Sequence, residues 1–138
     1  MTKRVLIVGS MGYIGWPLGF FLEDMGYEVC RLDSLIKNWW KDELGIEALG
    51  VTARKTPDFF CDVADKQLYE IFESFQPDAI VHLAEQPSAP LSMLSHRWAQ
   101  TSMRNNVLGT LTLAFAASHL ASRTGKMPHI VKLGTMGE

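Results

Sequence analysis

Cysteine is scarce in this 138-residue sequence, and so is any excess of charge of one sign. The only cysteines, Cys30 and Cys61, lie in apolar runs typical of strands, which argues against a disulfide framework or a cysteine-based metal site. Thirteen Lys and Arg against fifteen Asp and Glu leave a net charge of −2, and no segment concentrates either sign. We therefore expect no binding to nucleic acid and none to an anionic membrane surface.

Long hydrophobic runs are also missing. None reaches the roughly 18 residues of a membrane-spanning helix, and the apolar run that begins at Val5 is too short for the core of a signal peptide. With 47% hydrophobic and 20% charged residues, the composition is that of an ordinary globular protein. We expect one domain, residues 1–138, in the reducing environment of the cytoplasm.

Strand and helix signals alternate along the chain, which is the pattern of a parallel α/β sheet. Short apolar runs predict five strands, near residues 5–8, 28–32, 59–61, 79–84 and 129–133. Helices are predicted between them, over residues 13–24, 42–49, 65–76 and 95–121. Residues 85–94, which contain two prolines, are predicted to form a loop. The sequence therefore predicts a parallel α/β sheet of five strands.

Three glycines between the first strand and the first helix form the clearest motif. Gly9, Gly12 and Gly15 give a G-x-x-G-x-x-G sequence in the strand–turn–helix context of a dinucleotide-binding fingerprint. Glycines at these positions allow a tight turn and close approach of a pyrophosphate, which then lies at the helix N-terminus. The alternative is a tight turn with a purely structural role.

Two aspartates end the second and third predicted strands. Asp33 lies 18 residues beyond Gly15. At this position a carboxylate accepts hydrogen bonds from the adenosine ribose and repels a 2′-phosphate, which favours NAD over NADP. The alternative for Asp33 is a helix or turn cap. For Asp62 two interpretations stay open, an adenine contact and a turn cap.

Polar residues follow the fourth and fifth strands, at the edge where open α/β sheets bind ligands. Glu85 and Gln86 are predicted to face the nicotinamide end of the cofactor or the substrate, with a solvated polar loop as the alternative. Thr135 is placed to hydrogen-bond a sugar hydroxyl undergoing oxidation, with Glu138 as a nearby carboxylate. The alternative for Thr135 is an ordinary strand-end residue. His82, inside an apolar strand, is predicted to be a core histidine.

Taken together, these segments resemble the extended short-chain dehydrogenase/reductase family of nucleotide-sugar enzymes. The resemblance rests on the glycine motif, Asp33, Asp62, the His82-Leu-Ala stretch, Asn106-Val-Leu-Gly-Thr110 and Thr135. Within the family, two strings resemble the UDP-sulfoquinovose synthases. They are Glu85-Gln-Pro-Ser-Ala-Pro-Leu-Ser-Met93 and Lys132-Leu-Gly-Thr-Met-Gly-Glu138.

The resemblance implies a Rossmann-like, doubly wound parallel sheet with strand order 3-2-1-4-5. It also implies a tightly held NAD and a reaction on UDP-glucose. The sugar would be oxidised at C4, undergo elimination to a 5,6-ene, add sulfite and be reduced again. Thr135 and Glu138 would act in catalysis, and substrate or sulfite would be bound by Glu85, Gln86 and Ser88. The cofactor site implied by the resemblance consists of Gly9, Met11, Gly12, Tyr13, Ile14, Gly15, Asp33, Asp62, Val63, Leu83 and Asn106.

Two other interpretations of function stay open: another NAD-dependent sugar-nucleotide epimerase or 4,6-dehydratase, and a non-catalytic dinucleotide-binding module or half of a split enzyme. None of Tyr13, Tyr27 and Tyr69 has a lysine four positions later, so the family's Tyr-x-x-x-Lys pair is not among these residues. We therefore expect the N-terminal, NAD-binding part of a longer enzyme, ending after its fifth strand and inactive alone. Its fifth strand is expected to self-associate or to pair with a partner chain.

Overall fold

The structure is a computed structural model that describes residues 2–36 and 57–134. The helix predicted over residues 42–49 lies outside the described residues. The same holds for two predicted site residues, Thr135 and Glu138.

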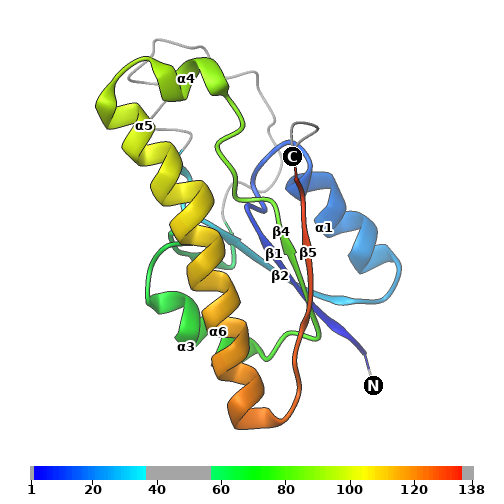
Figure 1. The fold of residues 1–138 in the computed structure, drawn as a ribbon. Coiled ribbons are helices and arrows are strands. Elements are labelled where there is room, and N and C mark those ends of the chain that lie inside the picture. The colour runs from blue at the N-terminus through cyan, green and yellow to red at the C-terminus, as the bar shows by residue number, and fades with distance from the viewer. Residues whose placement is uncertain (1, 37–56, 135–138) are drawn as a thin grey trace.

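Five parallel strands form one sheet in the order β3-β2-β1-β4-β5 (Figure 1). The strands are β1 (Arg4–Val8), β2 (Glu28–Asp33), β3 (Phe59–Phe60), β4 (Ala79–His82) and β5 (His129–Lys132). The central strand β1 pairs in register with both neighbours, so that Leu6 lies opposite Cys30 on β2 and Ile80 on β4. The predicted Rossmann-like sheet and its strand order are confirmed.

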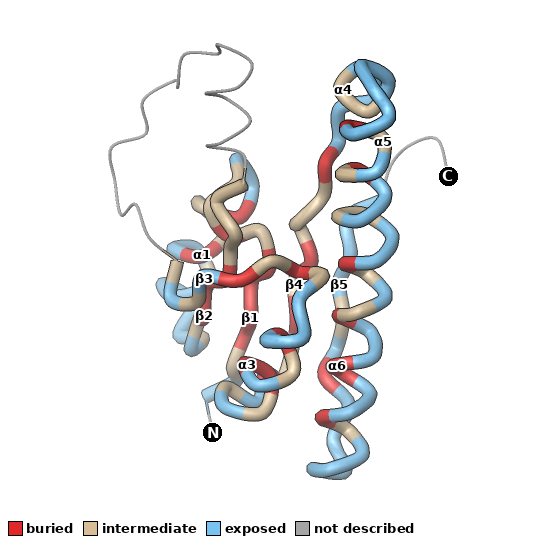
Figure 2. Tube along the Cα trace, turned by 90° about the vertical axis from the view of Figure 1, so that its left-hand side faces the viewer, coloured by how far each residue is buried: buried red, intermediate tan, exposed pale blue. Residues whose placement is uncertain are grey.

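The sheet is covered by helices on both faces, because its central strand is apolar on both sides. Val5 to Val8 are all at most 5% exposed, as expected for a strand of a parallel sheet. α1 (Gly15–Asp24) lies on one face, and α3 (Gln67–Phe75) and α6 (Gly109–Thr124) lie on the other (Figures 1 and 2). None of the helices in the described part of the chain has the length and apolar character needed to cross a membrane.

The core lies mainly between the sheet and the α3–α6 layer. On α3 the buried residues follow the helical spacing i, i+3, i+4, at Leu68, Ile71 and Phe72. Facing residues of α6 complete this core, at Leu113, Ala116, Ala117 and Leu120. The opposite side of α6 carries exposed apolar side chains, among them Leu111 and Phe115.

Two sequence predictions about the region after β4 are wrong. The predicted loop over residues 85–94 contains a short helix, α4 (Ala89–Met93), because the Ser88 hydroxyl caps it and Pro90 fits its first turn. The helix predicted over residues 95–121 is divided into α5 (His96–Met103), a π-helical turn η1 (Arg104–Leu108) and α6. Apolar periodicity does not reveal the extra residue that such a turn accommodates.

The fifth strand lies at the edge of the sheet. β5 pairs with β4 alone within the described residues, and three of its four residues are exposed. An unpaired strand edge favours pairing with another chain. The self-association or partner chain expected at this edge stays a prediction.

Candidate dinucleotide-binding site

The first glycine turn is held between the ends of β2 and β4. The amides of Gly9 and Ser10 donate hydrogen bonds to the Leu32 carbonyl, over 2.9 and 3.1 Å. Gly9 has a φ of +86°, and a Cβ there would lie 2.6 Å from the backbone of Leu83 and of Ala84. Only glycine fits this position, because any side chain would overlap the backbone that follows β4.

Gly15 brings the first turn of α1 directly onto the glycine turn. A Cβ on Gly15 would lie 2.4 Å from the Gly9 carbonyl oxygen and 2.8 Å from the Ser10 Cα. The amide of Gly12 donates to the Gly9 carbonyl over 3.3 Å, which closes the turn. Amide groups at the start of a helix have no partner within it, so this turn and the start of α1 have the geometry that suits a pyrophosphate. The contact of Gly9, Gly12 and Gly15 with the cofactor stays a prediction.

Asp33 ties the glycine turn to the end of β2. Its Oδ2 accepts a hydrogen bond from the Met11 amide, and its Oδ1 accepts one from the Leu35 amide, both over 2.8 Å. The carboxylate therefore has the capping role that the sequence left open. Each carboxylate oxygen has a second lone pair, so Asp33 keeps acceptor capacity for ribose hydroxyls. Its contact with the cofactor stays a prediction.

Asp62 also acts as a turn cap. Its Oδ1 accepts a hydrogen bond from the Ala64 amide over 2.8 Å, and its Oδ2 forms an ion pair with Arg104 Nη1. Val63 is buried, and its Cγ1 lies 2.4 Å from the position that a Cβ on Gly109 would take. The segment after β3 thus packs against the start of α6. The adenine contact predicted for Asp62 and Val63 is not tested by this geometry.

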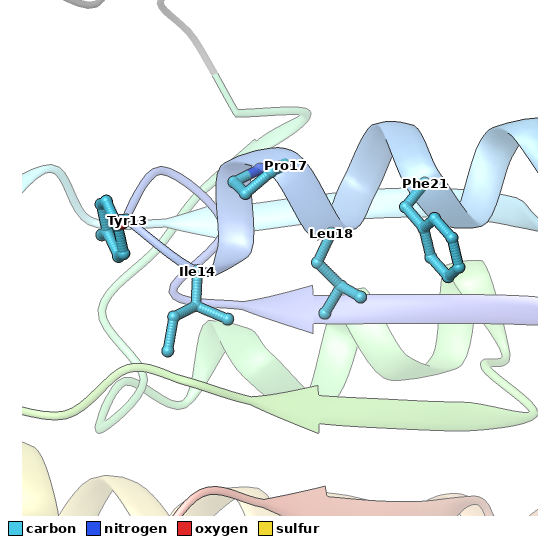
Figure 3. A pocket seen from close by; sticks show the side chains of 5 residues that line it. All are labelled: Tyr13, Ile14, Pro17, Leu18 and Phe21. Atoms are coloured by element: carbon cyan, nitrogen blue, oxygen red, sulfur yellow. The ribbon is translucent and has the colours of Figure 1, made fainter.

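Tyr13 and Ile14 lie on the outer side of the turn. They line an open apolar hollow along α1 together with Pro17, Leu18 and Phe21 (Figure 3). Tyr13 is 97% exposed, so its side chain is accessible from solvent. Both residues stay predicted cofactor contacts.

Gln86 is buried at the centre of the loop that follows β4. Its Nε2 donates hydrogen bonds to the Ser88 carbonyl over 2.9 Å and to Ser102 Oγ over 3.0 Å, while its Oε1 accepts from the Ser88 amide. The Ser88 hydroxyl in turn accepts from the Leu91 amide, at the start of α4. In this structure two of the three predicted substrate residues, Gln86 and Ser88, shape the loop. Their contact with substrate or sulfite stays a prediction.

An asparagine pair in η1 clamps the same loop. Asn106 accepts a hydrogen bond from the Gln86 amide over 2.8 Å and donates one to the Gln86 carbonyl over 3.0 Å. Asn105 donates to the Ala84 carbonyl over 2.9 Å. Leu83, a predicted cofactor contact, extends the sheet by donating its amide to the Val8 carbonyl over 2.7 Å. The π-helical turn therefore fixes the path of the chain beyond β4.

A buried histidine and an ion pair lie where β4 and β5 end. His82 is fully buried, as predicted, and its Nε2 lies 3.1 Å from Thr110 Oγ1. Because Thr110 Oγ1 donates to the Asn106 carbonyl, its oxygen accepts from His82, which places the imidazole proton on Nε2. Glu85 Oε1 lies 3.1 Å from Lys132 Nζ and 3.6 Å from His82 Nε2.

The buried imidazole makes stability depend on pH. Burial, with a smaller effect of the Lys132 charge, lowers the pKa of His82 from 6.5 to about 4. The unfolded chain therefore takes up this proton first as the pH falls. Stability is complete above about pH 6.5 and decreases towards pH 4, by about 3 kcal/mol from this group. Urea unfolding at several pH values measures the slope.

Two variants separate His82 from other titrating groups. His82→Gln should flatten the slope between pH 6.5 and 4, whatever its own cost in stability. His129→Gln, at the exposed start of β5, should leave the slope unchanged. Equal slopes in all three proteins would contradict the assignment to His82.

Residues 5–136 match the NAD dependent epimerase/dehydratase family. The chain belongs to this family. It is 36% identical to the chloroplastic UDP-sulfoquinovose synthase of Spinacia oleracea, over 99% of this chain and 30% of that protein. It is 33% identical to the UDP-sulfoquinovose synthase of Sulfolobus acidocaldarius, over 98% of this chain and 37% of that protein.

A solved structure of the family agrees with the fold. The UDP-glucose 4-epimerase of Thermus thermophilus, in complex with NAD, superposes with a TM-score of 0.66 at 28% identity, over 86% of this chain and 35% of that chain. The chain spans about a third of the length of these relatives. Family membership confirms two predictions from the sequence, the Rossmann-like fold and NAD as the cofactor.

Sequence reasoning missed two residues that shape this site. Asn105 stands beside Asn106 inside a predicted helix, and two adjacent asparagines there are a signal, since this residue type disfavours helix interiors. Arg104 gave no such signal, because its partner Asp62 is 42 residues away.

Proposed function

We propose that this chain is the NAD-binding part of an enzyme that converts UDP-glucose and sulfite to UDP-sulfoquinovose through a 4-keto intermediate. The observation that carries the proposal is the 33–36% identity to two UDP-sulfoquinovose synthases over 98–99% of the chain. That span includes both the glycine turn and the loop fixed by Gln86 and Asn106.

The geometry supports the cofactor part of this proposal. A Cβ at Gly9 or at Gly15 would overlap neighbouring backbone, and the turn leads directly into the start of α1, which suits a pyrophosphate. Asp33, at the end of β2, suits the adenosine ribose. Bound NAD supplies an acceptor for the hydride lost from the sugar. On the opposite side of the turn, Glu85 follows the end of β4 and Lys132 is the last residue of β5, beside the expected nicotinamide end.

We expect the chain to bind NAD at least about tenfold more tightly than NADP, because a 2′-phosphate would face the Asp33 carboxylate. Asp33→Asn keeps the shape and one acceptor oxygen but removes the charge. It should therefore reduce the difference in affinity between NAD and NADP. Asp65→Asn is the matched control, since Asp65 caps α3 through the Gln67 amide. Titration calorimetry with both cofactors measures the ratio. Equal affinity in the unchanged chain would contradict the role of Asp33.

Product analysis tests the reaction. The 138 residues alone should bind NAD without turning over UDP-glucose, because the Tyr-x-x-x-Lys pair that assists oxidation is not among them. Extended by a segment that carries this pair, the protein should form a sulfonated sugar nucleotide only when sulfite is present. A 4-epimer or a 4-keto-6-deoxy sugar would instead show an epimerase or a 4,6-dehydratase and would contradict the sulfite step.

A further inference from the structure

Arg104 joins two segments that are 42 residues apart in the sequence. Its Nη1 forms an ion pair with Oδ2 of Asp62, just beyond the carboxyl end of β3. The other oxygen of that carboxylate accepts the Ala64 amide, so the carboxylate cannot rotate freely. The guanidinium group is therefore held at a defined place beside the end of β3.

The backbone that carries Arg104 is fixed as well. The Gly109 amide donates to the Arg104 carbonyl, the hydrogen bond that defines the π-helical turn. Gly109 leaves room for Val63, and Figure 2 shows the segment after β3 crossing the sheet edge towards α6. Turns of this kind are frequent at functional sites.

The position of Arg104 coincides with the adenosine end of the expected dinucleotide. Asp33, at the end of β2, marks the ribose, and β3 is the strand next to β2. A base attached to that ribose extends towards Asp62. The Arg104 side chain is 51% exposed there, so it is accessible to a ligand.

We propose that Arg104 is a cofactor-binding residue whose guanidinium group stacks on the adenine base and is oriented for this by Asp62. The proposal rests on the proposed function, since it needs a dinucleotide at this edge of the sheet. A guanidinium group is planar and weakly hydrated, and it binds well to aromatic faces. The ion pair holds it in position before the ligand arrives, which reduces the entropy lost on binding.

The test compares ligands that contain adenine with one that does not. Arg104→Ala in the 138-residue chain should weaken binding of NAD and of ADP-ribose by about three- to thirtyfold. Binding of nicotinamide mononucleotide, measured by competition, should not change. Arg104→Lys keeps the charge but loses the planar group. Its affinity for NAD and for ADP-ribose should therefore lie between that of the unchanged chain and that of Arg104→Ala. Thermal unfolding checks that both variants are folded.

The matched control is Arg123→Ala. Arg123 also forms an exposed ion pair, with Glu73, but at the opposite end of α6. Its loss should leave all three affinities unchanged. If Arg104→Ala binds ADP-ribose as tightly as Arg123→Ala, or loses nicotinamide mononucleotide to the same degree, the adenine contact is wrong while NAD binding stands. If the unchanged chain binds neither NAD nor ADP-ribose, the proposed function fails as well.

Discussion

Gly9→Ala is expected to abolish NAD binding and to destabilise the fold by about 2–5 kcal/mol. A non-glycine residue in this left-handed conformation costs about 1–2 kcal/mol. The new Cβ would also lie 2.6 Å from the backbone of Leu83 and of Ala84, and relieving such an overlap costs about 1–3 kcal/mol more. Moving the turn away from β4 would displace the backbone amides that are proposed to bind the pyrophosphate. Urea unfolding and calorimetry with NAD measure the two effects.

Gly26→Ala is the control that separates the two contributions. Gly26 has nearly the same backbone, with φ at +84° against +86° for Gly9, but nothing lies within 4 Å of its Cβ position. Gly26→Ala should therefore lower the free energy of unfolding by only about 1–2 kcal/mol, and the variant should bind NAD normally. If the two variants were equally stable, close contact with β4 would not be the reason for glycine at position 9.

The strands and the glycine turn could be predicted because their signals are local. An apolar run such as Val5–Val8 is buried on both faces in a parallel sheet, and three spaced glycines before a helix have few structural alternatives. The parallel sheet follows from the regular alternation of strands with helices, whereas the strand order is implied by the resemblance to the nucleotide-sugar enzymes. These features need no information about which distant side chains meet.

The orientation of side chains in the loops could not be predicted in the same way. Gln86 reads as a polar loop residue, but Ser102 and Asn106 from the following helix turn it into a buried centre of hydrogen bonds. The π-helical turn that brings Asn106 there has no signature in the apolar pattern. Arg104 and Asp62, far apart in the sequence, meet where Val63 packs against Gly109. Each of these contacts depends on tertiary structure.

A contact between neighbouring elements secures α1, whose first turn carries the glycine motif. Arg31 on β2 is 1% exposed, and both terminal nitrogens of its guanidinium group donate to the Glu23 carboxylate, over 2.7 and 2.8 Å. Its guanidinium nitrogens occupy the space beside Gly19, 2.8 Å from where a Cβ would lie. The Phe20 ring centroid is 5.1 Å from the guanidinium carbon. The helix is thus joined to the sheet through one buried cation.

Glu23→Ala is expected to cost about 3 kcal/mol, because it leaves the Arg31 guanidinium group buried without its carboxylate. Glu73→Ala is the matched control, since Glu73 is 38% exposed and Glu23 is 39% exposed, while the arginine partners are 63% and 1% exposed. The exposed pair should contribute at most about 1 kcal/mol.

A buried ion pair can be replaced by apolar groups at little cost, so Glu23→Ala combined with Arg31→Met should recover most of the loss. Denaturant unfolding of the unchanged chain and of these variants measures the free energies of unfolding that are compared. If the double variant is less stable than Glu23→Ala alone, the cost does not come from an unpaired buried charge, and Arg31 stabilises α1 mainly by packing against Gly19 and Phe20.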